Sequence, residues 1–338
     1  MKKISVGTTK SYDILIKNGL LKECGQLTSA VKKLCKVMIC CDETVKKLYG
    51  GTVFESYGAA GFNCEFFTFA PGEKSKTTGT VTELLENMGA AEFDRGDLLV
   101  ALGGGVAGDI GGFAAALYMR GIDYVQIPTT LLAAVDSAVG GKTGVNLACG
   151  KNMAGSFWQP ILVVCDTDVF KTLSSEVYSG GVAEVIKYGF IFGSCPWELA
   201  VDDMVAACCK YKADIVAKDE RDKEGRLLLN FGHTIGHAIE KASDYTILHG
   251  QAVAIGMAAV ARAAEKRQIV GIGTASHVEE VCKKFGLPTK TDVEISKIKS
   301  AARADKKRDE SGITVIILDR AVHFTMDELD SFIEEGLA

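Results

Sequence analysis

The stretch "DLLVALGGGVAGDIGGFAA", residues 97–115, joins an apolar run, a group of glycines and the beginning of a helical segment. The apolar part is continuous rather than alternating, as in a parallel strand buried on both faces. Gly103, Gly105 and Gly108 follow with G-x-G-x-x-G spacing. In this context glycines let the backbone approach a pyrophosphate, and the helix N-terminus offers oriented N–H donors. The stretch therefore predicts a nucleotide-binding α/β unit; the alternative is a glycine cluster that serves only close packing of helix on strand.

Strands and helices alternate on both sides of this stretch. Helical segments such as 76–93 and 108–119 lie between short runs rich in Val, Ile and Phe, which are residues 36–42, 64–70, 97–104, 124–128 and 161–166. Such alternation predicts an open α/β sheet with helices on both faces. The glycine motif lies far from the start of the chain, and Asp42 closes an earlier strand, where a carboxylate could bind a ribose hydroxyl. We therefore expect a variant of the Rossmann arrangement.

From residue 171 onward the pattern changes to apolar residues at three- and four-residue spacing, with many small residues. This predicts a mainly helical region with one short hairpin at 312–324. We expect two domains, 1–170 and 171–338, with an active site in the cleft between them.

Composition narrows the class of protein. A chain of 338 residues with 47% hydrophobic and 24% charged residues is typical of a soluble globular protein of two domains. No apolar run is long enough to cross a membrane, and the N-terminus lacks the features of a secretory signal. A net charge of −5 argues against nucleic acid as a partner. The eleven cysteines are odd in number and form no CxxC pair, which predicts free thiols in a cytoplasmic protein.

Charged and amide side chains follow the glycine motif on glycine-rich segments: Asp109, Arg120, Asp136, Lys142, Lys151 and Asn152. Each alone would be a solvated surface group, but together they predict a polar site. An ATP-binding P-loop is excluded, because the stretch 135–144 has Asp136 where that motif requires glycine.

Three of the five histidines, His233, His237 and His249, lie within seventeen residues. The first two are four residues apart and so share one face of a helix. The glutamate of a hydrolytic H-E-x-x-H motif is missing between them. Spacing alone predicts all three as metal ligands, and a carboxylate could replace one of them, with Glu184 as the best candidate. We assign His277 and His323 to packing or capping.

Several long motifs together resemble the 3-dehydroquinate synthases of the sugar-phosphate cyclase family. They are "GGGVAGDIGGFAAALYMRG" (103–121), "VQIPTTLLAAVDSAVGGKTGVN" (125–146), "GKNMAGSFWQP" (150–160), "SGGVAEVIKYG" (179–189), "DERDKEGRLLLNFGHTIGHAIE" (219–240) and "LHGQAVAIGM" (248–257). The likeness extends from residue 71 to residue 312. It implies an N-terminal Rossmann-like NAD-binding α/β domain followed by a mainly helical metal-binding domain.

The resemblance also implies roles for individual residues. A divalent metal, typically zinc with cobalt as an alternative, would be bound by Glu184, His233 and His249, whereas His237 would belong to a proton relay. The other catalytic residues would be Lys142, Lys187, Asp136 and Asn152. Substrate would be bound by Lys151, Lys212, Arg226, Asn230 and Lys306 or Lys307, and Arg120 would reach the site of a neighbouring subunit in a homodimer. NAD would contact Asp42, Glu73, Lys76, Gly103, Gly104, Gly105, Val106, Asp109, Thr129, Thr130, Lys142 and Lys151.

The implied reaction converts 3-deoxy-D-arabino-heptulosonate 7-phosphate to 3-dehydroquinate and phosphate, in the shikimate pathway that leads to chorismate and the aromatic amino acids. It proceeds by transient oxidation with NAD, phosphate elimination, re-reduction, ring opening and an intramolecular aldol step. The alternatives are a sister cyclase that acts on sedoheptulose 7-phosphate or glucose 6-phosphate, a metal-dependent polyol dehydrogenase, and a non-catalytic nucleotide-binding scaffold. Lys212, Arg226 and Asn230 are retained here, which favours the substrate with a carboxylate.

The chain departs from the family pattern at three positions. Gln251 and Asp222 each stand where glutamate is usual, and Ser174 replaces a common proline. Gln251 lies close to His249, so it could alter the charge around a metal. None of the three removes an expected ligand.

Overall fold

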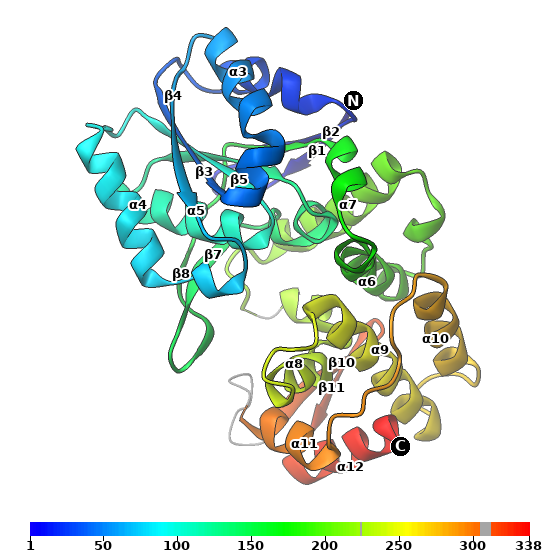
Figure 1. Ribbon diagram of the computed structural model, residues 1–338. Coiled ribbons are helices and arrows are strands. Elements are labelled where there is room, and N and C mark those ends of the chain that lie inside the picture. Colours follow the sequence, from blue (N-terminus) through cyan, green and yellow to red (C-terminus); the bar gives the residue numbers. More distant parts are fainter. Residues whose placement is uncertain (224, 305–311) are drawn as a thin grey trace. The chain divides into compact units, whose positions relative to one another are not determined.

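The computed structural model describes residues 1–223, 225–304 and 312–338 (Figure 1). Contacts within the chain define two compact units. The first comprises residues 1–173 and 200–221, and the second comprises residues 174–199 and 222–338. Residues 200–221 therefore group with the first unit, whereas the division drawn from the sequence placed them in the second.

A seven-stranded sheet forms the centre of the first unit, in the order β1-β2-β9-β6-β5-β3-β4. Its strands are β1 (Lys2–Val6), β2 (Tyr12–Ile16), β3 (Lys36–Asp42), β4 (Asn63–Phe69), β5 (Leu98–Gly103), β6 (Asp123–Pro128) and β9 (Leu162–Cys165). All neighbours pair in parallel except β1 and β2, which are antiparallel at one edge. All five predicted strands are confirmed.

The helices of the first unit are α1 (Cys24–Ser29), α2 (Glu43–Val45), α3 (Gly51–Ala59), α4 (Thr78–Ala90), α5 (Gly105–Leu117) and α7 (Val201–Lys218). Every residue of β5 is buried, as expected for a central strand covered on both faces. On one face Leu99 and Ala101 pack against α5, where Gly111 allows the helix to lie directly on the strand. Alternate residues of β3, β4 and β5, together with Tyr124 of β6, join side chains of α4 and α5 in one apolar cluster.

A two-stranded hairpin of β7 (Lys142–Leu147) and β8 (Gly150–Phe157) was not predicted from the sequence. Both strands carry small and polar residues rather than an apolar run. Gly144 and Gly155 face each other so closely that a Cβ on Gly155 would lie 2.2 Å from the carbonyl oxygen of Thr143. The hairpin therefore depends on close backbone approach, with Val145 as its buried apolar side chain.

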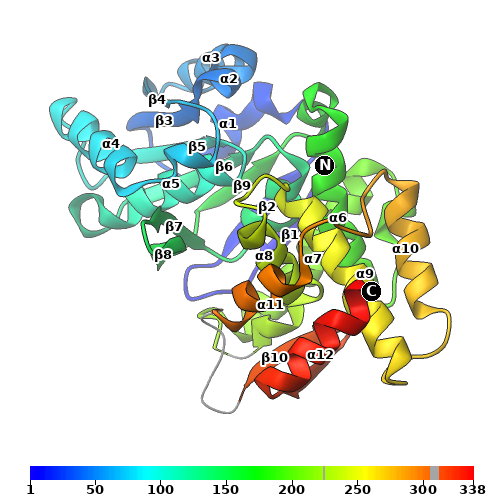
Figure 2. The ribbon, with the colours of Figure 1, turned by 60° about the horizontal axis from the view of Figure 1, so that its bottom comes forward.

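Helices dominate the second unit, in which α6, α8, α10 and α12 all pack on α9 (Figure 2). They are α6 (Ser175–Phe192), α8 (His233–Ala242), α9 (His249–Lys266), α10 (Thr274–Lys284), α11 (Ile295–Arg303) and α12 (Met326–Leu337). The predicted hairpin is present as β10 (Ile313–Ile317) and β11 (Arg320–Phe324). The expected fold class, an α/β region followed by a helical one, is confirmed.

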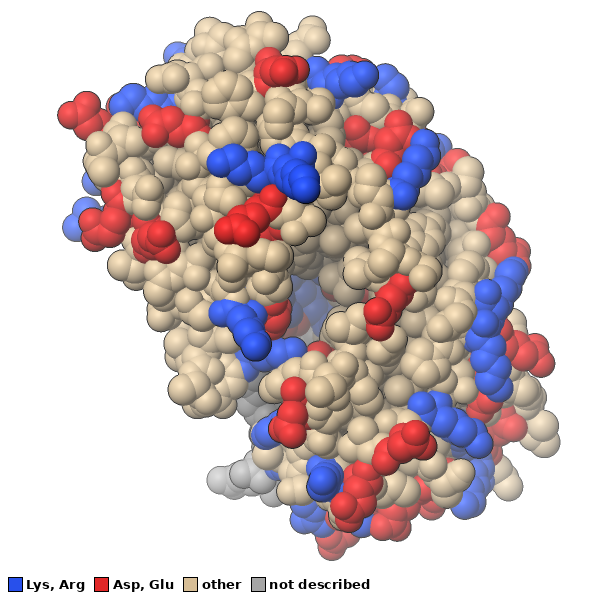
Figure 3. Space-filling view, in the orientation of Figure 1, with Lys and Arg blue, Asp and Glu red and all other residues tan. Residues whose placement is uncertain are grey.

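One face of the molecule is of mixed charge (Figure 3). On the face drawn in Figure 3, acidic and basic side chains of the described residues are interspersed rather than gathered into a basic stripe. Within the described ranges, no helix is both long and apolar enough to cross a membrane. All eleven cysteines are free thiols.

Candidate active site

The glycine turn lies between the end of β5 and the beginning of α5. Gly103 has a φ of 155°, and a Cβ at this position would lie 2.6 Å from the Cβ of Ala107. No side chain caps the N-terminus of α5, which follows Gly104 directly. The turn therefore has glycine for a steric reason, and the first N–H groups of the helix are not occupied by a capping side chain.

Three predicted nucleotide contacts lie at the carboxyl ends of adjacent strands. Asp42 ends β3, Gly103 ends β5, and Thr129 follows β6 and donates its backbone N–H to the carbonyl of Gly103 at 2.9 Å. Since β4 and β5 pair with opposite sides of β3, the chain changes direction across the sheet at this point. In open α/β sheets a ligand binds outside the strand ends at such a switch point.

Asp42 also has a local structural role. Its Oδ1 accepts hydrogen bonds from the backbone N–H groups of Thr44 and Val45, at 2.8 and 3.0 Å. These bonds orient the carboxylate at the end of β3. Thr130 is held in a similar way, because its hydroxyl accepts from the N–H of Ala133 at 3.2 Å while its methyl group lies against Gly104.

A buried lysine connects several of the other predicted residues. Lys76 is 5% exposed, forms an ion pair with Asp109 and donates to Oδ1 of Asn152 at 2.5 Å. Burial raises the pKa of Asp109, an effect that the charge of Lys76 opposes. Glu73 contacts the same group of residues through Asn146, whose side-chain amide donates to Oε1 of Glu73 at 2.7 Å.

Asn146 was not predicted from the sequence. Besides contacting Glu73, its Oδ1 accepts the backbone N–H of Asn152 at 2.9 Å, and its own N–H donates to the carbonyl of Lys76 at 2.9 Å. These bonds hold Asn152, which has a φ of 54°, in a left-handed conformation that asparagine tolerates. The only signal in the sequence was that Asn146 ends one of the motifs that carry the family resemblance.

Lys212 and Asp136 form a second polar pair within the first unit. The ammonium group of Lys212 on α7 donates to Oδ1 and to the backbone carbonyl of Asp136, each at 2.8 Å. Of the remaining residues predicted in this unit, Lys142 and Arg120 are exposed, and Val106 and Lys151 are half-buried. The pair fixes α7 to the glycine-rich segment after β6.

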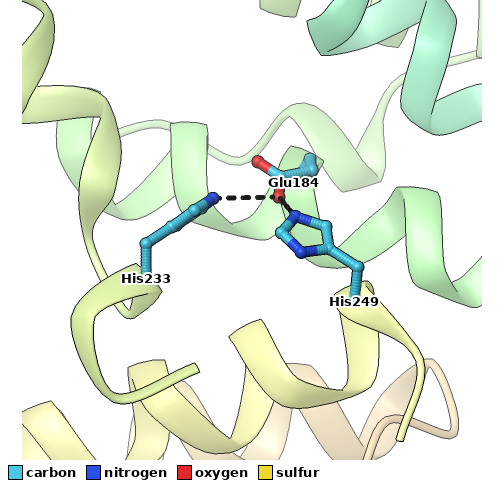
Figure 4. A group of neighbouring side chains, drawn as sticks. All are labelled: Glu184, His233 and His249. Carbon is cyan, nitrogen blue, oxygen red and sulfur yellow. Dashed lines mark ion pairs between the residues drawn. The ribbon is translucent and has the colours of Figure 1, made fainter. Parts of the chain in front are cut away.

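The second unit brings together Glu184, His233 and His249, from three different helices (Figure 4). His233 and His249 are the first residues of α8 and α9, and Glu184 lies in the middle of α6. Both imidazoles direct Nε2 toward the same oxygen, Oε1 of Glu184, at 3.4 and 3.3 Å. One potential ligand atom from each residue lies within 4.8 Å of the others, which is the arrangement that a single metal ion requires.

The charges around Glu184 explain how a fully buried carboxylate is maintained. Its side chain is 0% exposed, and Lys187, one helical turn later, forms an ion pair with Oε2. Burial alone would raise the pKa of Glu184, but Lys187 and the two histidines hold it well below its usual value. Neither carboxylate oxygen has a hydrogen-bond partner of good geometry among the described residues. A buried anion in this state is prepared to bind a cation.

The two histidines differ in their electrostatic surroundings. Burial lowers the pKa of His233, an effect that Glu184 opposes only in part. Burial would also lower the pKa of His249, but the carboxylates of Glu184 and Glu240, which face its two ring nitrogens, raise it to about 10. His249 therefore lies between two carboxylates, the second of which sequence reasoning did not identify.

The remaining predicted residues of the second unit lie close to this cluster in the chain. The ring of His237 is 5.3 Å from that of His233 and 5.8 Å from that of His249. Arg226 is 3% exposed, and the amide of Asn230 donates to the carbonyl of Leu227 at 3.0 Å. Lys306 and its alternative Lys307 lie outside the described residues.

Comparisons with known proteins agree over almost the whole chain. Residues 66–179 match the model for the N-terminal part of 3-dehydroquinate synthase, and residues 181–308 match the model for its C-terminal part. The chain is 39% identical to the 3-dehydroquinate synthase of Clostridium kluyveri, with 95% of this chain and 94% of the relative covered. It is 40% identical to that of Streptococcus suis, with 96% and 97% covered.

Solved structures show the same fold. A 2-deoxy-scyllo-inosose synthase complexed with carbaglucose-6-phosphate, NAD+ and Co2+ superposes with a TM-score of 0.89 at 25% identity, over 99% of this chain and 100% of that chain. The 2-epi-5-epi-valiolone synthase of Streptomyces hygroscopicus, with NAD+ and Zn2+ bound, has a TM-score of 0.84 at 26% identity, over 99% of each chain. With two family models matched in succession and relatives at about 40% identity, this chain belongs to the 3-dehydroquinate synthase family.

Proposed function

We propose that this protein is a 3-dehydroquinate synthase of the shikimate pathway, which converts 3-deoxy-D-arabino-heptulosonate 7-phosphate to 3-dehydroquinate and phosphate. The observation that carries the proposal is the group of Glu184, His233 and His249 in a chain of this family. A site in which one carboxylate and two imidazoles meet has the donor set of a catalytic zinc ion, with room for substrate as a further ligand.

The residues present fit a divalent metal. Glu184 has two buried oxygens, one paired with Lys187, and both histidines direct the same ring nitrogen at the other. We therefore assign Glu184, His233 and His249 as the ligands of a divalent ion, with zinc first and cobalt as the alternative. Two structural relatives have Co2+ or Zn2+ bound, which supports this choice.

The carboxyl ends of β3, β5 and β6 form a surface that fits NAD. The glycine turn would admit the pyrophosphate, and the carboxylate of Asp42 would bind a ribose hydroxyl. Around them we assign the cofactor contacts Glu73, Lys76, Gly103, Gly104, Gly105, Val106, Asp109, Thr129, Thr130, Lys142 and Lys151. When bound, NAD supplies a reversible hydride acceptor and the metal supplies an electrophile that acidifies a hydroxyl group.

The chain's own residues would bind the substrate and move its protons. Lys212, Arg226 and Asn230, together with Lys151, are suited to a carboxylate and a phosphate, since charge-assisted hydrogen bonds to such groups are strong. Lys306 lies outside the described residues and remains an assignment from the family pattern. His237, half-buried beside both metal ligands, would carry a proton to and from a substrate oxygen, because imidazole titrates near neutral pH. Asp136, Lys142, Asn152 and Lys187 would orient the reacting groups.

The sister cyclases are the main alternative, since the two solved structures described above are a 2-deoxy-scyllo-inosose synthase and a 2-epi-5-epi-valiolone synthase. Their identity to this chain is 25–26%, whereas the 3-dehydroquinate synthases reach 39–40%. An iron-containing alcohol dehydrogenase of similar fold is 15% identical, so it shares the fold alone with this chain. The difference in identity favours the substrate with a carboxylate.

A homodimer is the assembly that we propose. Arg120 follows α5 in a left-handed conformation, with a φ of 69°, and is exposed. Large apolar side chains are exposed just before it and on the hairpin that packs near α5, namely Leu117, Met119, Met153 and Phe157. Such side chains are suited to an interface, across which Arg120 would reach the partner's substrate.

A cytoplasmic location is supported by the free cysteines, which a reducing compartment would preserve.

The decisive experiment is incubation of the protein with the heptulosonate phosphate, zinc and a catalytic amount of NAD. We expect one phosphate released for each 3-dehydroquinate formed, without accumulation of NADH. Turnover of sedoheptulose 7-phosphate instead would assign the chain to a sister cyclase, and stoichiometric NADH would assign it to the polyol dehydrogenases.

A second experiment tests the dimer. If each active site is shared between two subunits, mixing inactive Arg120→Ala and Lys187→Met chains should restore part of the activity.

A further inference from the structure

His249 lies between two buried carboxylates. Its Nε2 faces Oε1 of Glu184 at 3.3 Å, and its Nδ1 faces Oε2 of Glu240 at 3.0 Å. Glu240 is 6% exposed and lies on α8, two helical turns after His233. We propose that Glu240 is a positioning residue, which accepts the Nδ1 proton of His249 so that Nε2 directs its lone pair toward the metal position beside Glu184. This inference rests on the proposed metal site.

The comparison with His233 shows what Glu240 adds. The Nδ1 of His233 lies 3.1 Å from the backbone carbonyl oxygen of Phe231, a neutral acceptor. Both ligands therefore have an acceptor at Nδ1 and present Nε2 to Glu184. Of the two, only His249 has a charged acceptor at Nδ1, the carboxylate of Glu240. An anionic acceptor fixes the orientation of the ring and makes the imidazole a more basic ligand.

Close packing of two helices makes this contact possible. Gly236 on α8 lies against α9, where an added Cβ would come within 3.0 Å of the carbonyl oxygen of Ala252. Gly256 lies so close to the segment before α8 that a Cβ there would be 2.1 Å from the carbonyl oxygen of Gly232. These glycines bring the end of α8 next to the beginning of α9, where His249 lies.

The burial of Glu240 is better explained by this role than by stability. A buried carboxylate costs free energy unless it is hydrogen-bonded or paired, and pairs of this kind contribute little net stability. The described contacts of its carboxylate include that with His249, the residue expected to hold a metal. We infer that Glu240 is retained for the geometry and strength of the metal site.

A second interpretation is that Glu240 binds a metal itself. Potential ligand atoms of His237, Glu240 and His249 also lie within 4.8 Å of one another. This group shares His249 with the first, and would use Nδ1 where the first uses Nε2. The number of ions bound by each chain separates the two interpretations.

The test uses Co2+ as the probe, because its visible absorption reports the ligand field independently of activity. The full chain is titrated with Co2+, and bound Co2+ is then displaced by Zn2+. The variants are Glu240→Gln, which removes the charge at constant shape, and Glu240→Asp, which keeps the charge. Lys241→Gln, at the next and exposed position of α8, is the matched control. Circular dichroism of each protein verifies the helical content.

We expect one Co2+ per chain, an affinity about 10- to 100-fold weaker and a shifted spectrum in Glu240→Gln, and a smaller loss in Glu240→Asp. The control should behave as the wild type. Unchanged affinity and spectrum in Glu240→Gln would overturn the positioning role while leaving the metal site intact. Two ions per wild-type chain, with one lost in Glu240→Gln, would overturn it in favour of a second site. Failure of the wild type to bind Co2+ or Zn2+ would instead refute the metal assignment itself, and this inference with it.

Discussion

Lys187 and Glu184, three residues apart on α6, form an ion pair in which the two side chains are 1% and 0% exposed. Removing two charges from water costs more than their attraction usually returns, so such a pair is weak evidence for stability. The lysine instead maintains a carboxylate in its charged form at a position where two histidines converge. The free energy of unfolding of a Lys187 variant, measured with and without zinc, therefore tests the metal site.

Lys187→Met should leave the buried carboxylate of Glu184 without its lysine partner, with His233 and His249 still beside it. We expect the free energy of unfolding, measured in urea without added metal, to fall by about 3–5 kcal/mol. Added zinc should stabilise this variant more than the wild type, since the ion would supply the missing positive charge. Equal stabilisation of both proteins by zinc would contradict a metal position at Glu184.

Replacement of single histidines should separate ligands from their neighbour. His249→Ala is expected to lose bound zinc and activity together, whereas His237→Ala should keep the zinc and lose activity. His277→Ala is the control, because that ring packs edge-on against Phe190, at 5.3 Å between centroids. Metal content by atomic absorption is the measurement, and equal zinc loss from His237→Ala and His249→Ala would restore the interpretation in which all three histidines are ligands.

Gly103→Ala should impair cofactor binding. The new methyl group would lie 2.6 Å from the Cβ of Ala107, so the turn after β5 would have to move. We expect NAD to bind at least about tenfold more weakly by calorimetry, a loss of roughly 1.4 kcal/mol. Gly89→Ala is the matched control, since that glycine is exposed on α4 with no atom within 4 Å of an added Cβ. It should bind NAD normally and gain about 0.5–1 kcal/mol of stability.

Asp123→Asn should change stability in a manner that depends on pH. Burial would raise the pKa of Asp123, but hydrogen bonds from Lys10 and Lys32, at 2.5 and 2.8 Å, outweigh it and lower the pKa. A carboxyl with a lowered pKa in the folded state stabilises the protein above its unfolded pKa, near 4, and loses this contribution as the pH falls through the folded value.

We therefore expect Asp123→Asn to reduce the free energy of unfolding by about 1 kcal/mol at pH 7, and by progressively less below pH 4. Asp203→Asn is the comparison. The carboxylate of Asp203 pairs with Lys2 but is 52% exposed, so its loss should change the free energy of unfolding very little. A loss that stays the same between pH 7 and pH 3 would show that Asp123 acts through its shape rather than its charge.

Gln251→Glu tests the departure from the family pattern next to His249. The amide of Gln251 donates to Oε1 of Glu176 at 3.1 Å, and its Oε1 accepts the N–H of Leu248 at 3.3 Å. Glutamate could keep the second bond but would repel Glu176. We expect a loss of about 0.5 kcal/mol in thermal unfolding experiments, recovered in the double variant Gln251→Glu/Glu176→Gln. Additive effects of the two changes would mean that the residues do not interact.

Much of the fold could be predicted from local sequence. Continuous apolar runs identified β3, β4, β5, β6 and β9 because parallel strands are buried on both faces. The edge strand β1 and its neighbour β2 were missed; β1 alternates half-buried and exposed residues over only five positions. The strand–helix periodicity determined the fold class, but not that α7 groups with the first unit, because helical periodicity does not specify the surface on which a helix packs.

The residues of the candidate site also fall into two groups: those that could be identified from the sequence and those that only the fold revealed. The glycine turn and the three histidines could be identified from the chain alone, because the spacing of the glycines and of the imidazoles is a property of the sequence itself. Only the tertiary structure revealed the contacts of Asn146 with Glu73 and of Glu240 with His249. Such contacts depend on how closely two backbones approach, and that distance is decided by packing between residues that are not neighbours in the sequence.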